Sequence, residues 1–147
     1  MKLSTRSRYG SRAMVELAVD YPERAVSVKE MAKNERLSPK YLEQIMAALK
    51  AAGLVEAARG IHGGYRLTRP PTTIRLREIF EALEESPVLV KCILRPGTCP
   101  RETVCPTRDT WQELMEALVS VLDRTTLEDL AVRKKRKTHS PEPMYYI

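Results

Sequence analysis

Two serines constrain this chain most, because each opens a short helix and together they place two helices around one tight turn. Ser27 and Glu30 form the pattern S-x-x-E, in which each side chain satisfies an exposed backbone N–H of the other residue at a helix start. Ser38 precedes Pro39, and proline suits the first helical position because its missing N–H would be unpaired there. The apolar residues that follow recur at helical spacing: Leu42, Ile45, Met46 and Leu49. With Gly53 to close the second helix, the pattern predicts a helix-turn-helix.

A glycine-rich hairpin follows the predicted helix-turn-helix. Residues 54–58 and 65–68 are short strand-like runs, and residues 59–64 between them read RGIHGG. Glycine permits the positive φ angles that tight hairpin tips require. A hairpin directly after a helix-turn-helix is the wing of a winged helix, so the sequence predicts a mainly α fold with a small β wing.

Further helices are predicted on both sides of these elements. The first covers about Thr5 to Asp20, and others cover 76–84, 107–124 and 127–132, the last capped by Thr126. The helix at 107–124 carries an apolar stripe: Trp111, Leu114, Met115, Leu118, Val121 and Leu122. Such a stripe on a small chain favours a homodimer seam, although packing within the chain would also produce it.

The chain is predicted to have three regions: a winged helix-turn-helix DNA-binding domain at 1–70, a linker helix with the cysteine loop and dimerisation helix at 71–132, and a basic flexible tail at 133–147. The net charge of +6 is unevenly distributed over them. Residues 1–69 hold 13 basic against 7 acidic side chains, whereas residues 70–132 hold 7 against 11. We therefore expect an anionic partner to lie against the first region.

Several classes of function are excluded by the sequence. It holds no P-loop, no G-x-S-x-G and no paired histidines, so no enzymatic activity is expected. It has no apolar run of about 18 residues and begins with the polar, basic MKLSTRSRYG, so neither a membrane partner nor a signal peptide is expected. The expected compartment is the cytoplasm, where thiols stay reduced.

The outer face of the second helix of the helix-turn-helix is polar, and it presents Ser38, Lys40, Tyr41, Glu43, Gln44 and Lys50. Lys40 can hold a phosphate, Gln44 can pair with adenine, and Glu43 can accept from cytosine and repel phosphate elsewhere. At the hairpin tip, Arg59 is a candidate minor-groove probe, and Gly60 lets the backbone approach closely. A solvated surface would show the same residue types, but their position in a basic helix-turn-helix favours a double-stranded DNA operator as the partner.

All the cysteines lie in one loop rich in proline and glycine: Cys92, Cys99 and Cys105. Their odd number excludes a closed set of internal disulfides. Thiolates select iron–sulfur centres, zinc or copper(I), and structural zinc sites usually show C-x-x-C pairs, whereas the gaps here are six and five residues. The spacing favours an iron–sulfur cluster and leaves zinc or a thiol–disulfide switch open.

Four stretches together resemble the family of IscR, NsrR and CymR, which are dimeric winged-helix transcription regulators. They are MKLSTRSRYG, SPKYLEQIMAALKAAGLV, ARGIHGGYRL and TWQELMEALVSVLDRTTLEDL, and with the cysteine loop the resemblance covers nearly the whole chain to about Val132. It implies that the second helix of the helix-turn-helix enters the major groove, that Arg59 enters the minor groove and that Glu43 selects between two classes of DNA site. It also implies an iron–sulfur cluster, 2Fe–2S rather than 4Fe–4S, held by Cys92, Cys99 and Cys105.

The sequence departs from this family at the fourth cluster ligand. Arg108 stands where IscR supplies a histidine, and Arg8 stands where NsrR-like members supply an acidic residue. Glu102 and Asp109 are local candidates, and a thiol or water from solution could also fill the place. The fourth ligand is therefore unknown.

The end of the chain is similar to that of CymR, which implies a second partner, cysteine synthase, bound through Tyr146 and Ile147. A tail without a partner is an equal alternative. The sequence thus supports a repressor that senses a cluster and controls iron–sulfur cluster biogenesis, or a repressor of cysteine metabolism controlled by cysteine synthase. A third hypothesis is a metal-handling or redox protein in which the helix-turn-helix is only a scaffold.

Overall fold

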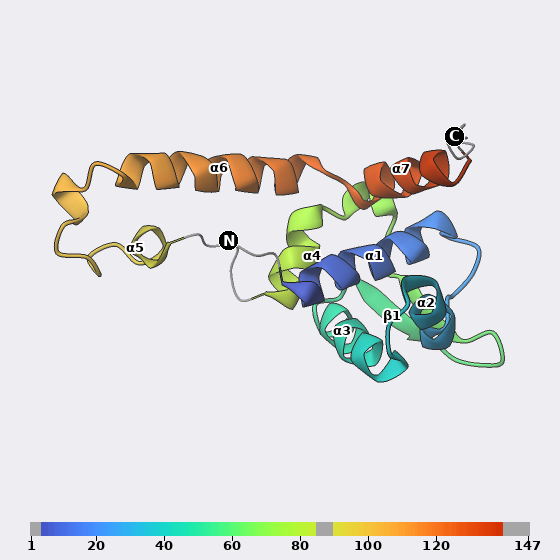
Figure 1. The fold of residues 1–147 in the computed structure, drawn as a ribbon. Helices are drawn as coiled ribbons and strands as arrows, with labels where there is room; N and C mark the ends of the chain where they lie inside the picture. The colour runs from blue at the N-terminus through green and yellow to red at the C-terminus, as the bar shows by residue number, and fades with distance from the viewer. Residues whose placement is uncertain (1–3, 85–89, 140–147) are drawn as a thin grey trace, which may run out of the picture.

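The computed structural model describes residues 4–84 and 90–139, and these are mainly helical. Figure 1 shows a helical domain with a two-stranded sheet, from which one long helix projects. In chain order the elements are α1 (Thr5–Val19), α2 (Val28–Glu35), α3 (Pro39–Ala51), β1 (Val55–Ala58), β2 (Gly64–Leu67), α4 (Leu76–Leu83), α5 (Lys91–Leu94), α6 (Arg108–Arg124) and α7 (Leu127–His139), with 3₁₀ turns at Pro71–Thr73 and Glu102–Val104. The predicted fold class, mainly α with a small β wing, is confirmed.

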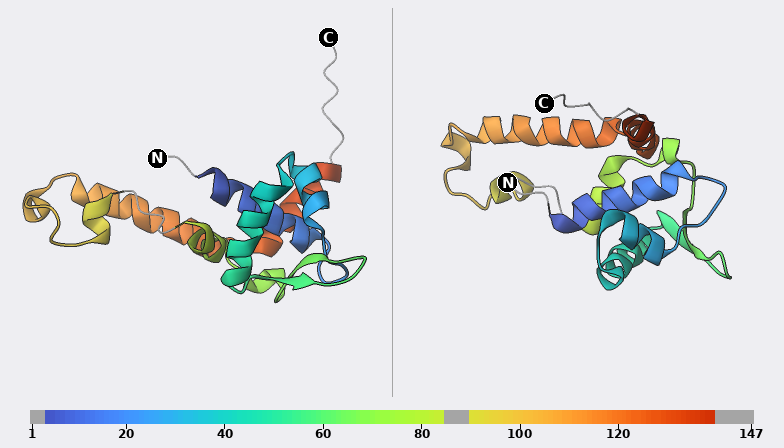
Figure 2. Two further views of the ribbon diagram at one scale, coloured as in Figure 1. Left: turned by 90° about the horizontal axis from the view of Figure 1, so that it is seen from below. Right: turned by 45° about the vertical axis from the view of Figure 1, so that its right-hand side comes forward.

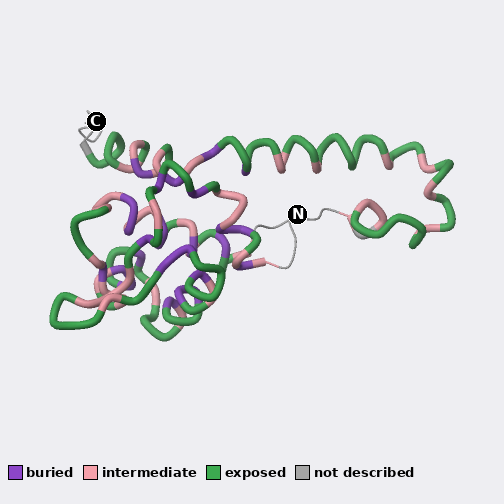
Figure 3. The backbone as a smooth tube through the Cα atoms, turned by 180° about the vertical axis from the view of Figure 1, so that it is seen from behind, coloured by how far each residue is buried: buried purple, intermediate pink, exposed green. Residues whose placement is uncertain are grey.

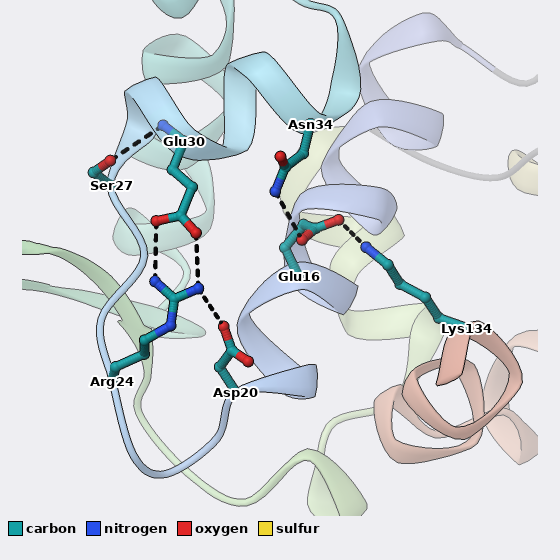
Figure 4. Close-up of polar contacts among 7 residues, drawn as sticks. All are labelled: Glu16, Asp20, Arg24, Ser27, Glu30, Asn34 and Lys134. Carbon is teal, nitrogen blue, oxygen red and sulfur yellow. Dashed lines mark hydrogen bonds and ion pairs between the residues drawn. The ribbon is translucent and has the colours of Figure 1, made fainter. Parts of the chain in front are cut away.

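The helix-turn-helix consists of α2 and α3, and a serine begins each helix as predicted. The Ser27 hydroxyl accepts from the Glu30 N–H at 3.1 Å, and the Ser38 hydroxyl accepts from the Tyr41 N–H at 3.2 Å. In the predicted capping box, the Ser27 N–H would donate to the Glu30 carboxylate. Instead, both carboxylate oxygens accept from Arg24 (Figure 4). The capping prediction is therefore half correct, since a nearby arginine competes for the carboxylate.

The predicted apolar stripe of α3 lies at the centre of the core, where four side chains are completely buried: Leu42, Ile45, Met46 and Leu49. They belong to one hydrophobic cluster with Met14 and Leu17 of α1, and full burial of each such side chain contributes about 1.5–3 kcal/mol. Gly53, at a φ of 73°, follows the helix and donates to the Lys50 carbonyl at 2.9 Å. One face of α3 is thus fixed inside the domain, and the opposite face is directed outward.

The wing is an antiparallel hairpin of β1 and β2, with Ala58 opposite Gly64. A third segment joins it, because Val26 and Tyr65 exchange two backbone hydrogen bonds of 2.9 Å. A Cβ at Gly64 would lie 2.3 Å from the Val26 carbonyl oxygen, so glycine permits this close approach. The hairpin is therefore attached to the segment before α2, a pairing that the sequence did not predict.

The helix α6 projects from the domain and leaves most of its length exposed (Figures 1 and 3). Its only buried residue is Leu122, whereas Trp111, Leu114 and Val121 of the predicted stripe are 38 %, 47 % and 43 % exposed. Further views show the same arm, with α5 and the cysteine loop beside its far end (Figure 2). Within the part of the chain that the structure describes, the domain covers the end of this apolar stripe at Leu122 and leaves Trp111, Leu114 and Val121 exposed.

The helix α7 is longer than predicted. The sequence predicts a helix that ends at Val132 and a flexible tail at 133–147, but the helix continues through the basic run to His139. Lysine and arginine are good helix formers, and the first proline after residue 127 is Pro141, so no residue stops the helix at Val132. The predicted partner residues of the tail, Tyr146 and Ile147, lie outside the described residues.

Two sets of contacts hold α7 in place. Thr126 caps its start as predicted, because its hydroxyl accepts from the Asp129 N–H at 3.1 Å while the Asp129 carboxylate accepts from the Thr126 N–H at 2.8 Å. Farther along, Lys134 forms an ion pair with Glu16 of α1 (Figure 4). These contacts fix the basic run against the first helix.

A carboxylate connects the end of α4 to the start of α1. One oxygen of Glu84 accepts from the Ser7 hydroxyl at 2.5 Å and from the Ser4 N–H at 3.3 Å, and Ser7 is completely buried. The bonds from Ser7 and then Ser4 hold the pKa of Glu84 below its ordinary value of 4.5. Its charge therefore stabilises the fold above pH 4.5, and this stabilisation is lost as the pH falls through the lowered pKa.

The substitution Glu84→Gln should destabilise the chain at neutral pH, because a neutral amide accepts more weakly than a carboxylate. The stability difference between wild type and variant, measured by urea unfolding, should shrink as the pH is lowered below 4.5. Glu113→Gln, which removes a charge from an exposed position of α6, is the control. A difference for Glu84→Gln that stays constant down to about pH 3 would contradict the assignment.

Candidate nucleic-acid interface and cysteine loop

The outward face of α3 carries four exposed residues of the predicted interface: Ser38, Lys40, Glu43 and Gln44. Because the opposite face of the same helix is buried, the backbone positions from which these side chains project are fixed. Lys50, on the last turn, is exposed as well. In Figure 1 both α3 and the hairpin lie on the lower side of the domain, away from α7. One polar helix face and one hairpin are thus presented on the same side.

Tyr41 differs from the other predicted interface residues, because it is half-buried. Its ring meets the ring of Tyr9 edge to face, with centroids 6.4 Å apart. The guanidinium groups of Arg8 and Arg12 each lie 5.7 Å from the Tyr9 centroid. Tyr41 therefore positions α3 on α1, a role that the sequence analysis missed, although Tyr9 stands on the apolar side of the first helix.

At the wing tip, Arg59 and Gly60 are exposed, as an interface requires. Gly60 adopts a φ of 107° with open space around it, and its carbonyl accepts from the Gly63 N–H at 3.0 Å to close the turn. Ile61 is 99 % exposed, which the sequence analysis did not single out. The tip is thus a narrow projection with one cation and one apolar side chain.

The three cysteines are spread along the loop, each of them partly buried and none in a disulfide. Cys92 lies in α5, and Cys105 follows the 3₁₀ turn. A hydrogen bond of 3.5 Å between the Cys105 thiol and the Thr107 hydroxyl lowers the pKa of that thiol. Among residues 4–84 and 90–139, no three His, Cys, Asp or Glu side chains gather closely enough to hold a metal ion.

An ion pair organises the loop at the position of the missing ligand. Arg108, the first residue of α6, donates to one Glu102 oxygen at 2.6 Å, and the other Glu102 oxygen accepts from the Gly97 N–H at 2.5 Å. Glu102, a candidate fourth ligand, is therefore engaged within the loop. Asp109, the other candidate, is exposed. Only a weak signal, two opposite charges six residues apart, could have predicted the ion pair.

The three cysteine thiols are of the right chemical type for an iron–sulfur cluster, but they do not lie close enough together to hold one. Three thiols in one loop are the ligand type that such clusters take. Their arrangement here does not bring them together, and the carboxylate of Glu102 already serves Arg108 and Gly97. Cluster binding would therefore require the loop to adopt a different arrangement.

A helix-turn-helix with an attached wing and a polar outer face defines a winged-helix DNA-binding protein. Residues 3–133 match the family model described as "Rrf2: Iron-dependent Transcriptional regulator", and the chain belongs to this Rrf2 family. Its members are transcriptional regulators and not enzymes, which agrees with the expected lack of a catalytic site.

Named relatives support the same assignment. The chain is 40 % identical to Protein rrf2 of Nitratidesulfovibrio vulgaris over 130 residues, which are 88 % of this chain and 87 % of that protein. It is similar to the structure of CymR, the global cysteine regulator of B. subtilis, with a TM-score of 0.78, 38 % identity and coverage of 90 % of this chain and 98 % of that one. Similarity to T. potens IscR gives a TM-score of 0.78 at 34 % identity, over 99 % and 97 % of the two chains. The resemblance to IscR and CymR is therefore confirmed.

Among the described residues, no helix is long and apolar enough to cross a membrane.

Substitutions on α3 should separate positioning from discrimination. Lys40→Ala should weaken binding to all duplexes alike and reduce the slope of log affinity against log salt by about 1, because one phosphate contact is lost. Glu43→Ala should instead strengthen binding to unrelated duplexes, because it removes a repulsive carboxylate. Fluorescence anisotropy over a salt series measures the affinity for each duplex and its dependence on salt. Arg95→Ala, in the cysteine loop, is the charge-matched control for Lys40→Ala. An unchanged slope in Lys40→Ala would remove that lysine from the interface.

Proposed function

We propose that this chain is a dimeric repressor that binds a double-stranded DNA operator and whose affinity is modulated by an iron–sulfur cluster. The observation that supports it most is the outward face of α3, which is polar, rigidly held and accompanied by a wing on the same side. In this proposal α3 enters the major groove and the hairpin enters the minor groove. Membership of the Rrf2 family supports the regulatory role.

Each interface residue has a proposed task that follows from its chemistry. Ser38 and Lys40 contact phosphate, Gln44 pairs with adenine, and Glu43 accepts from cytosine and rejects other sequences. At the wing, the Arg59 guanidinium enters a narrow minor groove, and Gly60 leaves space for the backbone of the DNA. Tyr41 maintains the angle of α3 through its contact with Tyr9.

The exposed stripe of α6 supports dimerisation. A projecting helix with Trp111, Leu114 and Val121 in solvent exposes apolar area that a second copy would bury. Two copies joined through α6 would present two α3 helices to two operator half-sites. The dimer is therefore proposed to pair α6 with α6.

The cluster is proposed to be of the 2Fe–2S type and to be held by Cys92, Cys99 and Cys105, with a fourth ligand that the loop does not define. When bound, it would supply iron–thiolate bonds that are sensitive to oxidants and to iron supply. The loop is joined to α6 through the ion pair Arg108–Glu102. A change in the position of the loop would therefore alter a contact of the proposed dimer helix. Genes of iron–sulfur cluster biogenesis are the proposed targets.

One observation favours an alternative: the similarity to CymR, whose structure is described as that of a global cysteine regulator. In this alternative the chain represses genes of cysteine metabolism, and cysteine synthase binds Tyr146 and Ile147. Its DNA interface is the same, so only the effector differs.

Anaerobically purified and reconstituted chain should contain iron and sulfide in equal amounts and absorb in the visible range. On operators selected from a random duplex pool, it should differ in affinity from the triple variant Cys92→Ala, Cys99→Ala, Cys105→Ala. Arg108→His, which introduces a nitrogen ligand at the position where IscR has a histidine, should slow cluster loss. Equal affinities of the reconstituted chain and the triple variant would remove the cluster proposal while leaving DNA binding intact. An affinity that instead responds to added purified cysteine synthase, and not after deletion of Ile147, would establish the alternative.

Leu114→Glu should shift the chain from dimer to monomer, because it places a charge in the proposed seam. We expect the dimer dissociation constant to rise at least about tenfold, as measured by sedimentation equilibrium. Gln112→Glu introduces the same charge on the opposite face of α6 and should leave the dimer intact. A dimer that is unaffected by Leu114→Glu would place the interface elsewhere.

A further inference from the structure

A cavity of about 790 Å³ is lined by residues of α1, α2, α4 and α7. Its apolar lining comes from Val15 of α1, Leu76 and Phe80 of α4, and Leu130 of α7. This volume lies within the range of small-molecule sites, roughly 300–1,000 Å³. Nothing in the proposed DNA-binding or cluster-binding role uses this space.

The rim of the cavity is strongly basic. Five cationic side chains line it, and two of them have acidic partners: Arg12 pairs with Glu35, and Lys134 pairs with Glu16. The other three form no ion pair with any acidic residue among 4–84 and 90–139, and they are Arg8, Arg133 and Lys137. Glu35 also lines the cavity and is the partner of Arg12, so the five cations still leave an excess of positive charge beside the apolar lining.

One residue of the lining, Ser11, also carries a buried hydroxyl without a hydrogen-bond partner. The Oγ atom of Ser11, which lines the cavity, is inaccessible to solvent and has no hydrogen-bond partner within the described chain. A buried polar group without a partner is unfavourable, and this hydroxyl would reach an acceptor in the cavity only after a shift of the side chains that cover it. Burial also lowers the pKa of the neighbouring Lys134, with a smaller contribution from Arg12, which indicates that this rim is partly shielded from water.

We propose that this cavity binds a small organic anion, with a single carboxylate-like head group on an apolar body. The three cations without an ion pair would receive the head group, and the apolar lining would receive the body. An inorganic ion would leave the apolar lining unfilled, and a neutral apolar molecule would leave the cations unpaired.

The cavity is connected to the DNA-reading helix through α1. Arg8 and Arg12, on its rim, lie against Tyr9, whose ring packs on Tyr41 of α3. Arg12 also pairs with Glu35 at the end of α2. A bound anion that attracts these arginines would change contacts of both helices of the helix-turn-helix. This coupling to operator affinity rests on the proposed function, whereas binding of the anion does not.

The test uses 1-anilinonaphthalene-8-sulfonate, an anion with an aromatic body, and its uncharged analogue N-phenyl-1-naphthylamine, both followed by fluorescence with the full chain. The anion should bind more tightly than the analogue, and dodecanoate should displace it. The variant Arg133→Gln, Lys137→Gln should bind the anion about tenfold more weakly, because two charge-assisted contacts are lost. The variant Lys135→Gln, Arg136→Gln removes the same charge from positions on α7 that do not line the cavity, and should bind as wild type does.

Amide chemical shifts supply a second measurement that does not depend on fluorescence. Dodecanoate should shift the resonances of Ser11, Val15 and Leu130, and shifts confined to α6 would overturn the proposal. Equal affinity for the charged and uncharged probes, or an unchanged affinity in Arg133→Gln, Lys137→Gln, would overturn it as well. Displacement of the probe by a peptide of residues 140–147, or by dimer formation at higher protein concentration, would assign the cavity to the chain itself. Operator binding is measured separately, without ligand, for wild type and for both double variants. Its loss or retention bears on the proposed function and not on binding of the anion.

Discussion

The packing of α1 determines how every other part of the domain is placed. The helices α2, α3, α4 and α7 and the strand β2 all pack against it. Small residues make this possible, because a Cβ at Gly10 would lie 2.2 Å from Leu83 Cδ1 and 3.2 Å from Ile45 Cγ2. Met14, completely buried, occupies the space between the packed elements. The direction of α3 in the domain is therefore set by its packing against α1.

Capping residues in the sequence predicted the helices whose ends are fixed by neighbouring residues. Ser27, Ser38 and Gly53 act within their own helix ends, so the sequence located α2 and α3 closely. The pairing of Val26 with Tyr65 connects residues far apart in the chain, and no local pattern indicates it. The true end of α7 was missed for a different reason. A run of charged residues was taken for a solvated tail, although its helix propensity is high and α1 offers a surface for it.

The candidate site was predictable in its residue types and less so in its geometry. Exposure of Lys40, Glu43 and Gln44 follows from the periodicity of α3, because the buried stripe defines the outer face. The cysteine loop has no such periodicity, so the sequence indicates the number of thiols and not their separation. Arg108 shows the difference most clearly. From the sequence, Arg108 indicates only that the histidine ligand of IscR is absent. In the structure, it forms the ion pair with Glu102 that holds the loop to α6.

The junction of α4, α6 and α7 connects the projecting arm rigidly to the domain. The Leu76 N–H donates to the Thr125 carbonyl and the Leu127 N–H donates to the Ile74 carbonyl, both at 2.9 Å. Because the backbone on each side of the junction is bonded in this way, α6 cannot swing freely about residue 125. The cavity is lined by Leu76 at this junction and by α7, and α7 packs against α1, which in turn contacts α3. The junction and the cavity are thus both connected to α3 through α1.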